Sequence, residues 1–333
     1  MAQPPQSSKL SSRLYYLRVK VQKVLWALLR IAGLVYVIFS LILFFGQDNL
    51  VFIPRKGVVG SPQELGLKYL NVKLKTEDGL QLGAWFIPVQ GKPALSSQSR
   101  QSPDITKESP KPNLDNISTI PQSESPVPLA ILFCHGNGGN IGNRLSYLPI
   151  FQNLGLSTLL FDYRGYGDSE GKPSEIGTYQ DVAAAWRYLT EEQKIPPQRI
   201  LIYGESLGGA VASYWAETLE AQSIKAGGLI LAGTFSHVND RAVELYPFFP
   251  VRLISRFNYQ SESRLPKIKI PVLIIHSRDD EIIPFSHGEK LFKAAREPKL
   301  FTILRGGHND AMFDSLEAYR GGLAKFMELV NRN

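Results

Sequence analysis

Hydrophobic positions fall into two arrangements along the chain. Near the N-terminus there is one long apolar run, and further on short apolar stretches alternate with amphipathic ones. The run covers residues 24–45 and contains a single charge, Arg30. As a helix it is long enough to cross a bilayer core of about 30 Å. Arg30 lies near the start of the run, where a long side chain can extend to the interface. The run therefore predicts a transmembrane helix.

An uncleaved signal anchor explains the run better than a cleaved signal peptide or an interfacial helix. The residues that follow, FFGQDN, contain no small-x-small cleavage site, and the run has no polar face beyond Arg30. We therefore expect a basic tail at residues 1–23 and a membrane anchor at residues 24–46, in contact with lipid. Basic residues precede the run in excess, which predicts a cytoplasmic N-terminus and places residues 47–333 on the other side.

Beyond residue 128 the periodicity alternates between strand-like and helix-like stretches. The predicted strands are Ala130–Phe133, Ser157–Phe161, Ile200–Tyr203, Leu229–Leu231, Val272–Ile275 and Leu300–Leu304. The predicted helices are Glu175–Leu189, Leu207–Leu219, His287–Ala295 and Ser315–Val330. Such alternation builds a mostly parallel sheet with helices on both faces, so the predicted fold class is α/β.

Two further segments precede this region. Residues 69–74 and 80–86 flank a turn at Glu77-Asp78-Gly79 and predict a hairpin. Residues 91–128 hold seven prolines and eight serines with little apolar periodicity, and predict a disordered surface insertion. The insertion includes an Asn-Ile-Ser sequon at Asn116, to which we give little weight.

The charge distribution excludes nucleic acid as a partner. The net charge is +7, but no acidic residue precedes Asp48, and the basic residues before it are Lys9, Arg13, Arg18, Lys20, Lys23 and Arg30. The rest of the chain is therefore nearly neutral and offers no basic surface for phosphates. One cysteine, Cys134, excludes an intrachain disulfide and a cysteine-based zinc site. No sequence feature predicts an oligomeric state.

The loop after the predicted strand Ile200–Tyr203 reads Gly204-Glu205-Ser206-Leu207-Gly208-Gly209, a G-x-S-x-G pattern. Between a strand and an amphipathic helix, this pattern presents a serine hydroxyl above the sheet at a helix N-terminus. We therefore identify Ser206 as a candidate nucleophile. The competing interpretation is a glycine-rich connection with an incidental serine.

A serine nucleophile needs an imidazole base and a carboxylate that orients it. Of five histidines we choose His308, because it lies in a glycine-rich loop just after the last strand. The carboxylate should follow a strand between Ser206 and His308, and we choose Asp280, with Asp279 as its main rival. The tetrahedral oxyanion also needs donors. We expect these to be the backbone N–H groups of Leu207 and Asn137, the latter in the loop HGNGGN.

With these motifs the chain resembles the α/β-hydrolase superfamily, in particular its membrane-anchored serine hydrolases, which include lipid esterases and protein depalmitoylases. The motifs that carry the resemblance are FCHGNGGN at 133–140, DYRGYGDSEGKPSE at 162–175, GESLGG at 204–209, IPVLIIHSRDDEIIP at 270–284 and GGHND at 306–310. The resemblance implies the order Ser206, Asp280, His308 for nucleophile, acid and base. It also implies a structural role for Arg164 and Asp168 in their turn.

The chain departs from the family pattern in two places. Ser277 replaces a usual glycine, and no cysteine precedes Cys134, although cytoplasmic depalmitoylases of this branch attach through an N-terminal cysteine cluster. The second departure argues against a cytoplasmic depalmitoylase.

An aromatic segment at about residues 233–268 lies where proteins of this fold carry a lid, and we expect it to be one. Its rings suggest an apolar substrate pocket that includes Phe235, Phe248 and Phe249, although they could equally pack the lid onto the body. We expect an acyl ester or thioester as substrate and no metal or organic cofactor. A peptidase or amidase of the same fold, and a binding protein without catalysis, remain the alternatives.

Overall fold

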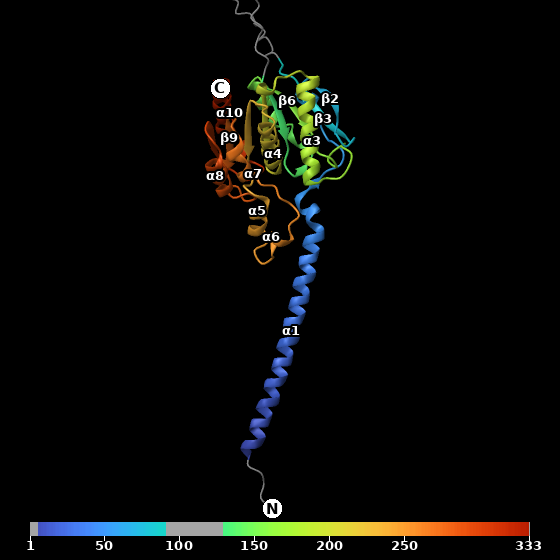
Figure 1. The fold of residues 1–333 in the computed structure, drawn as a ribbon, viewed down its shortest axis with the longest axis vertical. Coiled ribbons are helices and arrows are strands. Elements are labelled where there is room, and N and C mark those ends of the chain that lie inside the picture. Colours follow the sequence, from blue (N-terminus) through green and yellow to red (C-terminus); the bar gives the residue numbers. More distant parts are fainter. Residues whose placement is uncertain (1–5, 91–128, 333) are drawn as a thin grey trace, which may run out of the picture. The chain divides into compact units, whose positions relative to one another are not determined.

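The computed structural model describes residues 6–90 and 129–332, which divide into two units (Figure 1). One unit combines the N-terminal segment Met1–Ile53 with His237–Tyr259, and the other combines Pro54–Ser236 with Gln260–Asn333. The second unit is called the hydrolase unit below, after the family that its sequence resembles, and His237–Tyr259, which lies within the predicted lid, is called the lid segment. The insertion predicted at residues 91–128, with Asn116, lies outside the described residues.

The hydrolase unit is built on one eight-stranded sheet with the order β10-β9-β8-β7-β4-β6-β3-β2. Its strands are β2 (Leu70–Lys75), β3 (Gln81–Ile87), β4 (Ala130–Cys134), β6 (Ser157–Phe161), β7 (Ile200–Glu205), β8 (Gly228–Ala232), β9 (Val272–Ser277) and β10 (Lys299–Leu304). The strands from β10 to β6 are parallel, and β3 is antiparallel to both β6 and β2. The predicted α/β class and the hairpin are both found.

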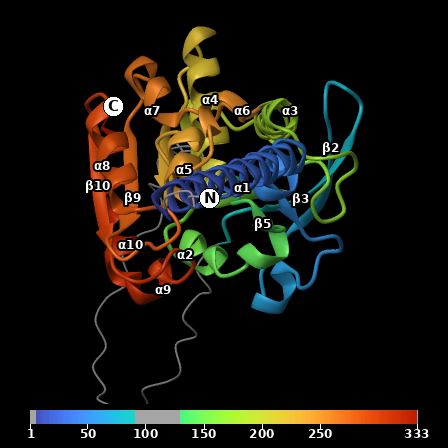
Figure 2. The same ribbon diagram turned by 90° about the horizontal axis from the view of Figure 1, so that it is seen from below.

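Helices cover both faces of this sheet (Figure 2). They are α2 (Tyr147–Asn153), α3 (Glu175–Arg187), α4 (Leu207–Ala221), α7 (Ser261–Arg264), α8 (Phe285–Ala294), α9 (Ala311–Asp314) and α10 (Leu316–Asn331). Shorter elements are the two-residue strands β1 (Ile53–Pro54) and β5 (Gly138–Gly139), the 3-10 turns η1 (Pro62–Leu65), η2 (Ile141–Arg144), η4 (Pro197–Arg199) and η5 (Leu265–Lys267), and the π-helical turn η3 (Tyr188–Glu192).

Alternate residues of the central strands face one core. Ile131 and Phe133 of β4 and Leu201 and Tyr203 of β7 pack in a single cluster with side chains of α2, α9 and α10. The intervening strand residues are also buried, because α3 and α4 cover the other face. Strands that are buried on both faces appear in the sequence as continuous apolar runs. This is why their positions could be predicted well from the sequence.

The parallel register aligns the carboxyl ends of the strands. Cys134 at the end of β4 pairs with Gly204 of β7, and Glu205 at the end of β7 pairs with Ala232 of β8. At the opposite edge, Ala130 pairs with Ser157, and Ile87, which ends β3, pairs with Thr158. Loops that follow β4, β7, β8, β9 and β10 therefore meet along one edge, where ligand sites of such sheets lie.

The turn after β6 is held by Arg164. Its guanidinium bonds to the fully buried carboxylate of Asp181 at 2.8 Å and reaches Asp78 of the β2–β3 turn at 2.9 Å. Burial raises the pKa of Asp181 to about 6, although the hydrogen bonds from Arg164 lower it. Arg164 thus connects the turn, α3 and the hairpin, in line with the structural role expected for it. Asp168 is exposed, and its backbone carbonyl accepts a bond from Lys73 at 3.5 Å.

The other unit consists of α1 (Gln6–Val51), α5 (Val238–Leu245) and α6 (Val251–Ile254). Helix α1 is continuous through residues 24–46, the predicted anchor, and ends at Val51. Among the described helices it is the one long and apolar enough to cross a membrane. Its side chains from Tyr15 onward include many exposed leucine, isoleucine, valine and aromatic residues.

We expect Arg164→Met to lower the free energy of unfolding by about 3 kcal/mol, because the buried Asp181 carboxylate would lose its partner. The matched control is Arg320→Met, which breaks an exposed pair with Glu317 and should change stability by less than about 1 kcal/mol. Thermal denaturation of both variants in detergent measures the difference. Similar small losses in the two variants would contradict this role for Arg164.

Candidate active site

Ser206 lies at a sharp turn between β7 and α4. Its backbone has φ +52° and ψ −121°, a conformation that a residue with a side chain rarely adopts. The two glycines of the motif allow the turn. A Cβ on Gly204 would collide with Gly209, and a Cβ on Gly208 would collide with the Cys134 carbonyl. The strand-to-helix turn expected from G-x-S-x-G is therefore present, with the first turn of α4 packed against the end of β4.

The turn itself is tied to the neighbouring strand. The Ser206 N–H donates to the Ala232 carbonyl at 2.9 Å, and the Thr234 hydroxyl donates to the Ser206 carbonyl at 2.6 Å. Both main-chain groups of Ser206 are thus held by residues at the end of β8. With its main chain held in this way, Ser206 presents only its side chain to other groups of the site.

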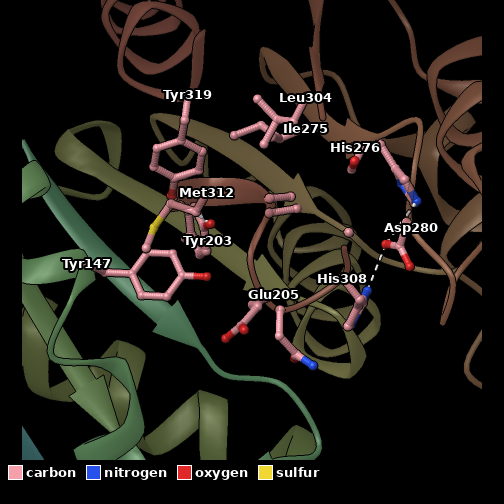
Figure 3. Close-up of a pocket in the computed structure, with 15 residues that line it drawn as sticks. Tyr147, Tyr203, Glu205, Ile275, His276, Asp280, Leu304, His308, Met312 and Tyr319 are labelled. Carbon is pink, nitrogen blue, oxygen red and sulfur yellow. Dashed lines mark hydrogen bonds and ion pairs between the residues drawn. The ribbon is translucent and has the colours of Figure 1, made fainter. Parts of the chain in front are cut away.

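Ser206, His308 and Asp280 form one chain of hydrogen bonds. His308 Nε2 lies 3.1 Å from Ser206 Oγ, and His308 Nδ1 lies 2.7 Å from Asp280 Oδ2. Figure 3 shows the contact between Asp280 and His308 at the edge of a cavity. Since the carboxylate accepts from Nδ1, the neutral ring has its Nε2 lone pair directed at the serine hydroxyl. Three residues that are 74 and 28 positions apart in the chain therefore meet as the sequence predicted.

Asp280 is fixed as an acceptor from two directions. Its Oδ1 accepts the N–H groups of Ile282 and Ile283 at 3.0 and 2.6 Å, while Oδ2 faces His308. Burial acts to raise the pKa of Asp280, but the hydrogen bond from His308 and the backbone bonds outweigh it, so the pKa lies below its ordinary value. The carboxylate is therefore ionised at neutral pH.

The acidic neighbours of Asp280 hold the loop that carries His308. Asp279 accepts the Gly306 N–H at 3.1 Å and pairs with Arg305, and Glu281 accepts the His308 N–H at 3.0 Å. Ser277, the departure from the family pattern, donates to the Gly306 carbonyl at 2.5 Å. Asp279, the rival for the role of Asp280, thus contacts the backbone and Arg305 instead of the imidazole.

The other four histidines, all within the described residues, do not hydrogen-bond to Ser206, although His276 Nε2 lies 3.6 Å from Asp280 Oδ2. His135 is buried, and burial lowers its pKa to about 3. His276 is also buried and donates from Nε2 to the Ile283 carbonyl at 2.8 Å. His287 contacts Ser236, and His237 caps α5 through its side chain. Among the described residues, no group of histidine, cysteine, aspartate and glutamate side chains is arranged to hold a metal ion.

The loop after β4 lies against Ser206. A Cβ built on Gly136 would be 3.3 Å from the Ser206 Cβ, a tight contact that a larger residue could make only if its neighbours shifted by a few tenths of an ångström. The next residue, Asn137, is held through its carbonyl, which accepts the Tyr166 hydroxyl at 2.8 Å. Leu207 is the first residue of α4, so its N–H has no carbonyl partner within the helix. The structure therefore places Gly136, the neighbour of Asn137, against Ser206, and Leu207 follows Ser206 directly, while their role as oxyanion donors stays a prediction.

Beside the serine lies an ion pair that sequence reasoning missed. Arg144 Nε bonds to Glu205 Oε2 at 2.6 Å, and the Arg144 guanidinium also donates to the Gly138 carbonyl at 3.1 Å. Arg144 thereby connects the residue before Ser206 to the glycine loop after β4. The only signal was the position of Glu205 within the motif, and its basic partner lies 61 residues earlier.

A small cavity of about 40 Å³ adjoins the histidine. In Figure 3 Tyr147, Tyr203, Tyr319 and Met312 group on one side of it and His308 and Asp280 on the other. The Tyr203 and Tyr319 hydroxyls are 2.8 Å apart. A cavity of this size holds one or two water molecules and is too small for an acyl chain.

The three predicted pocket residues do not line this cavity. Phe235 is a buried residue of the hydrolase unit. Phe248 and Phe249 belong to the lid segment, where Phe249 stacks on Tyr36 of α1. Their role in binding substrate stays a prediction.

We expect Ser206→Gly to be more stable than Ser206→Ala by about 1 kcal/mol, because glycine accepts the positive φ that strains alanine. Part of the gain is offset by the greater entropy of unfolded glycine. Thermal denaturation of the two variants, both without the hydroxyl, measures the strain alone. An alanine variant as stable as the glycine variant would mean that the turn stores no strain.

Known proteins share this architecture. A solved esterase of Pyrococcus furiosus, Pf2001, superposes with a TM-score of 0.60 over 84% of this chain and 97% of its own, at 15% identity, which shows a common fold. The protein bem46 of Schizosaccharomyces pombe is 31% identical over 76% of this chain and 75% of its own. The lysophosphatidylserine lipase ABHD12 of Danio rerio is 30% identical over 75% of this chain and 65% of its own. The model of the alpha/beta hydrolase fold matches residues 130–258. The chain belongs to the α/β-hydrolase family.

Proposed function

We propose that the protein is a serine hydrolase that cleaves carboxylic esters or thioesters through an acyl-enzyme on Ser206. One observation carries the proposal: His308 bridges Ser206 Oγ and Asp280 Oδ2 at 3.1 and 2.7 Å within the hydrolase unit. A serine hydroxyl is a weak nucleophile at neutral pH, and this arrangement supplies the base that activates it. Membership of the α/β-hydrolase family supports hydrolysis as the reaction.

In the first half of the reaction, Ser206 Oγ attacks the acyl carbon while His308 Nε2 takes the hydroxyl proton. The tetrahedral intermediate then expels the alcohol or thiol, which receives that proton, and the acyl group remains on Ser206. A water molecule, deprotonated by His308, attacks the acyl-enzyme and releases the acid and the free serine. Asp280 keeps Nδ1 protonated and stabilises the positive imidazolium that forms in each half.

The oxyanion of each tetrahedral intermediate is assigned to the N–H groups of Leu207 and Asn137. The start of α4 contributes the positive end of a helix dipole at the same place. Support comes from the close approach of Gly136 to Ser206 and from the bond between Tyr166 and the Asn137 carbonyl, which holds the loop. The Arg144–Glu205 pair would hold the glycine loop after β4 at a fixed position relative to Ser206.

The substrate class we propose is an acyl ester or thioester of a lipid-like molecule. The relative from Danio rerio is named a lysophosphatidylserine lipase, and this chain matches 65% of it. Helix α1 is long and apolar enough to serve as a membrane anchor. By the positive-inside rule the basic N-terminal tail lies in the cytoplasm and the hydrolase unit on the other side. An anchored enzyme would meet substrates that partition into the bilayer.

The first prediction from this proposed function tests Ser206 as the nucleophile. Full-length protein in detergent should be labelled covalently by a fluorophosphonate probe, and Ser206→Ala should abolish labelling because the reacting oxygen is gone. Circular dichroism should show that the variant is folded. Failure of folded wild-type protein to react would favour a binding protein without catalysis.

The second prediction separates the two adjacent carboxylates. Asp280→Asn should lower kcat by about 10⁴-fold, because an amide can hold the imidazole in the wrong tautomer. The matched control Asp279→Asn changes a residue that bonds to Gly306 and Arg305, and should lower kcat by less than about tenfold, a factor equal to 1.4 kcal/mol. The rates of hydrolysis of a short ester by both variants give the comparison. Equal losses would remove the assignment of Asp280.

The third prediction concerns the bond that is cleaved. In a series of p-nitrophenyl esters of increasing chain length and a matched series of aminoacyl amides, only the esters should be hydrolysed at a measurable rate. The p-nitrophenolate of these esters leaves as a stable anion, whereas an amine must be protonated before it can leave. Faster cleavage of amides than of esters would instead indicate a peptidase or amidase of this fold.

A further inference from the structure

The lid segment packs on the part of α1 that is predicted to lie in the membrane. The ring of Phe249 stacks on Tyr36 with centroids 5.4 Å apart and planes 6° apart, and it also contacts Phe39 at 6.0 Å. The Tyr36 hydroxyl donates to the Phe248 carbonyl at 3.2 Å. Both contacts lie within one compact unit. The tip of the lid segment and the middle of the apolar run are therefore at the same level.

A second set of contacts fixes the base of the lid segment near the end of α1. Gln47 donates from its side chain to the Ile254 carbonyl at 2.8 Å and accepts the Arg256 N–H at 2.7 Å. The Arg256 guanidinium pairs with Asp48 at 3.2 Å. Contacts at two levels along α1 define both the position and the direction of the lid segment along the helix.

The contacts with Tyr36 also give the depth of the tip of the lid segment in the bilayer. Tyr36 precedes Phe45, the last residue of the apolar run, by nine residues, which is about 14 Å along a helix. The hydrocarbon core of a bilayer is about 30 Å thick. If residues 24–45 span that core, the Phe248 carbonyl lies well inside it, even when the helix is tilted.

The surface of the lid segment suits such a position. Residues Leu245–Val251, LYPFFPV, contain no charge, and Phe248 and Leu253 are 85% and 87% exposed. Each charged side chain of the segment has an oppositely charged partner inside the same unit. These pairs are Arg241–Glu244, Arg252–Asp240 and Arg256–Asp48. Pairing lowers the cost of placing these charges in a medium of low dielectric constant.

We propose that residues 245–254 insert into the lipid bilayer beside α1, so that acyl chains reach the enzyme from the membrane. The partner of this surface is the hydrocarbon of the bilayer. Two exposed large apolar side chains on a segment already attached to a membrane helix are explained by contact with lipid. The idea deepens the proposed function and rests on it for the anchor and for the acyl substrate.

The segment is also connected to the nucleophile through the chain. Thr234, three residues before the lid segment begins, donates its hydroxyl to the Ser206 carbonyl at 2.6 Å. Within the hydrolase unit, Glu262 N–H donates to the Ser236 carbonyl at 3.0 Å and brings the two ends of the segment together. The residues that flank the lid segment on both sides are thus held within the hydrolase unit, and one of them bonds directly to the main chain of Ser206.

Depth-dependent fluorescence quenching tests the insertion. The full-length chain with a single introduced cysteine is labelled with an environment-sensitive nitrobenzoxadiazole dye and placed in phosphatidylcholine vesicles. The native Cys134 is fully buried, so wild-type protein serves as the labelling blank. The test position is Phe248→Cys. Leu34→Cys on α1 reports the anchor, and Gln222→Cys, at the end of α4 remote from Ser206, reports the hydrolase unit.

We expect lipids with a nitroxide deep in the acyl chain to quench the dye at 248 and 34, at least threefold more than the dye at 222. Quenching at 34 without quenching at 248 would overturn the insertion and keep the anchor. No quenching at either position would overturn both. A blue-shifted dye at 248 without lipid quenching would mean that a second protein copy covers the surface, which also overturns it.

A second measurement tests the consequence for substrates. Leu253→Glu should lower kcat/KM for a long-chain ester carried in vesicles by roughly tenfold or more, because a carboxylate opposes insertion. Hydrolysis of a short soluble ester should stay within about twofold, a free-energy change of about 0.4 kcal/mol. The matched control is Leu70→Glu, on an exposed position of β2. Equal losses on both substrates, or the same pattern in the control, would contradict entry from the bilayer. The quenching result does not depend on activity, so it separates a failure of insertion from a failure of the proposed chemistry.

Discussion

The tight turn at Ser206 is the constraint on which the other features of the site depend. A non-glycine residue at φ +52° can occupy this position only if its surroundings hold it there. Glycines at 204 and 208 let β4, β7 and α4 approach closely, and the bonds to Ala232 and Thr234 fix the main chain of the serine. The loop after β4 then passes close beside the serine, where a Cβ at Gly136 would already make a tight contact. One strained turn therefore favours glycine within the turn itself and in the loop after β4 that passes beside it.

Three consecutive acidic residues make separate contacts with the loop that carries His308. Asp279, Asp280 and Glu281 are consecutive, yet each bonds to a different group of the loop at 305–308. The two outer carboxylates accept backbone N–H groups of the loop, while Asp280 contacts the imidazole. Ser277 adds a third link through the Gly306 carbonyl. A catalytic role for a single carboxylate thus depends on neighbours that never touch the imidazole.

The sequence predicted the sheet well and the connections poorly, for physical reasons. Strand β6 was located at Ser157–Phe161 and the other strands within one or two residues, because strands buried on both faces are uninterrupted apolar runs. The candidate triad could be selected because strand ends in a parallel sheet share one edge. Helices α2 and α9 were missed, since each is a few residues long and shows no clear period. The contacts of Arg144 with Glu205 and of Tyr36 with Phe249 join residues 61 and 213 positions apart, and local patterns carry no information about such pairs.

The place where residues 91–128 join the described part of the fold has a consequence for the evolution of this protein. Strand β3 ends beside Thr158 and β4 begins beside Ser157, so the described residues on either side of the segment belong to the amino-terminal edge of the parallel strands. Ser206, Asp280 and His308 all follow carboxyl-terminal strand ends. Insertions and deletions between β3 and β4 therefore begin and end at the edge of the sheet opposite the candidate triad. We expect selection to tolerate them there. The same junction is a natural point for engineering, where a reporter domain could be carried with the chemistry undisturbed.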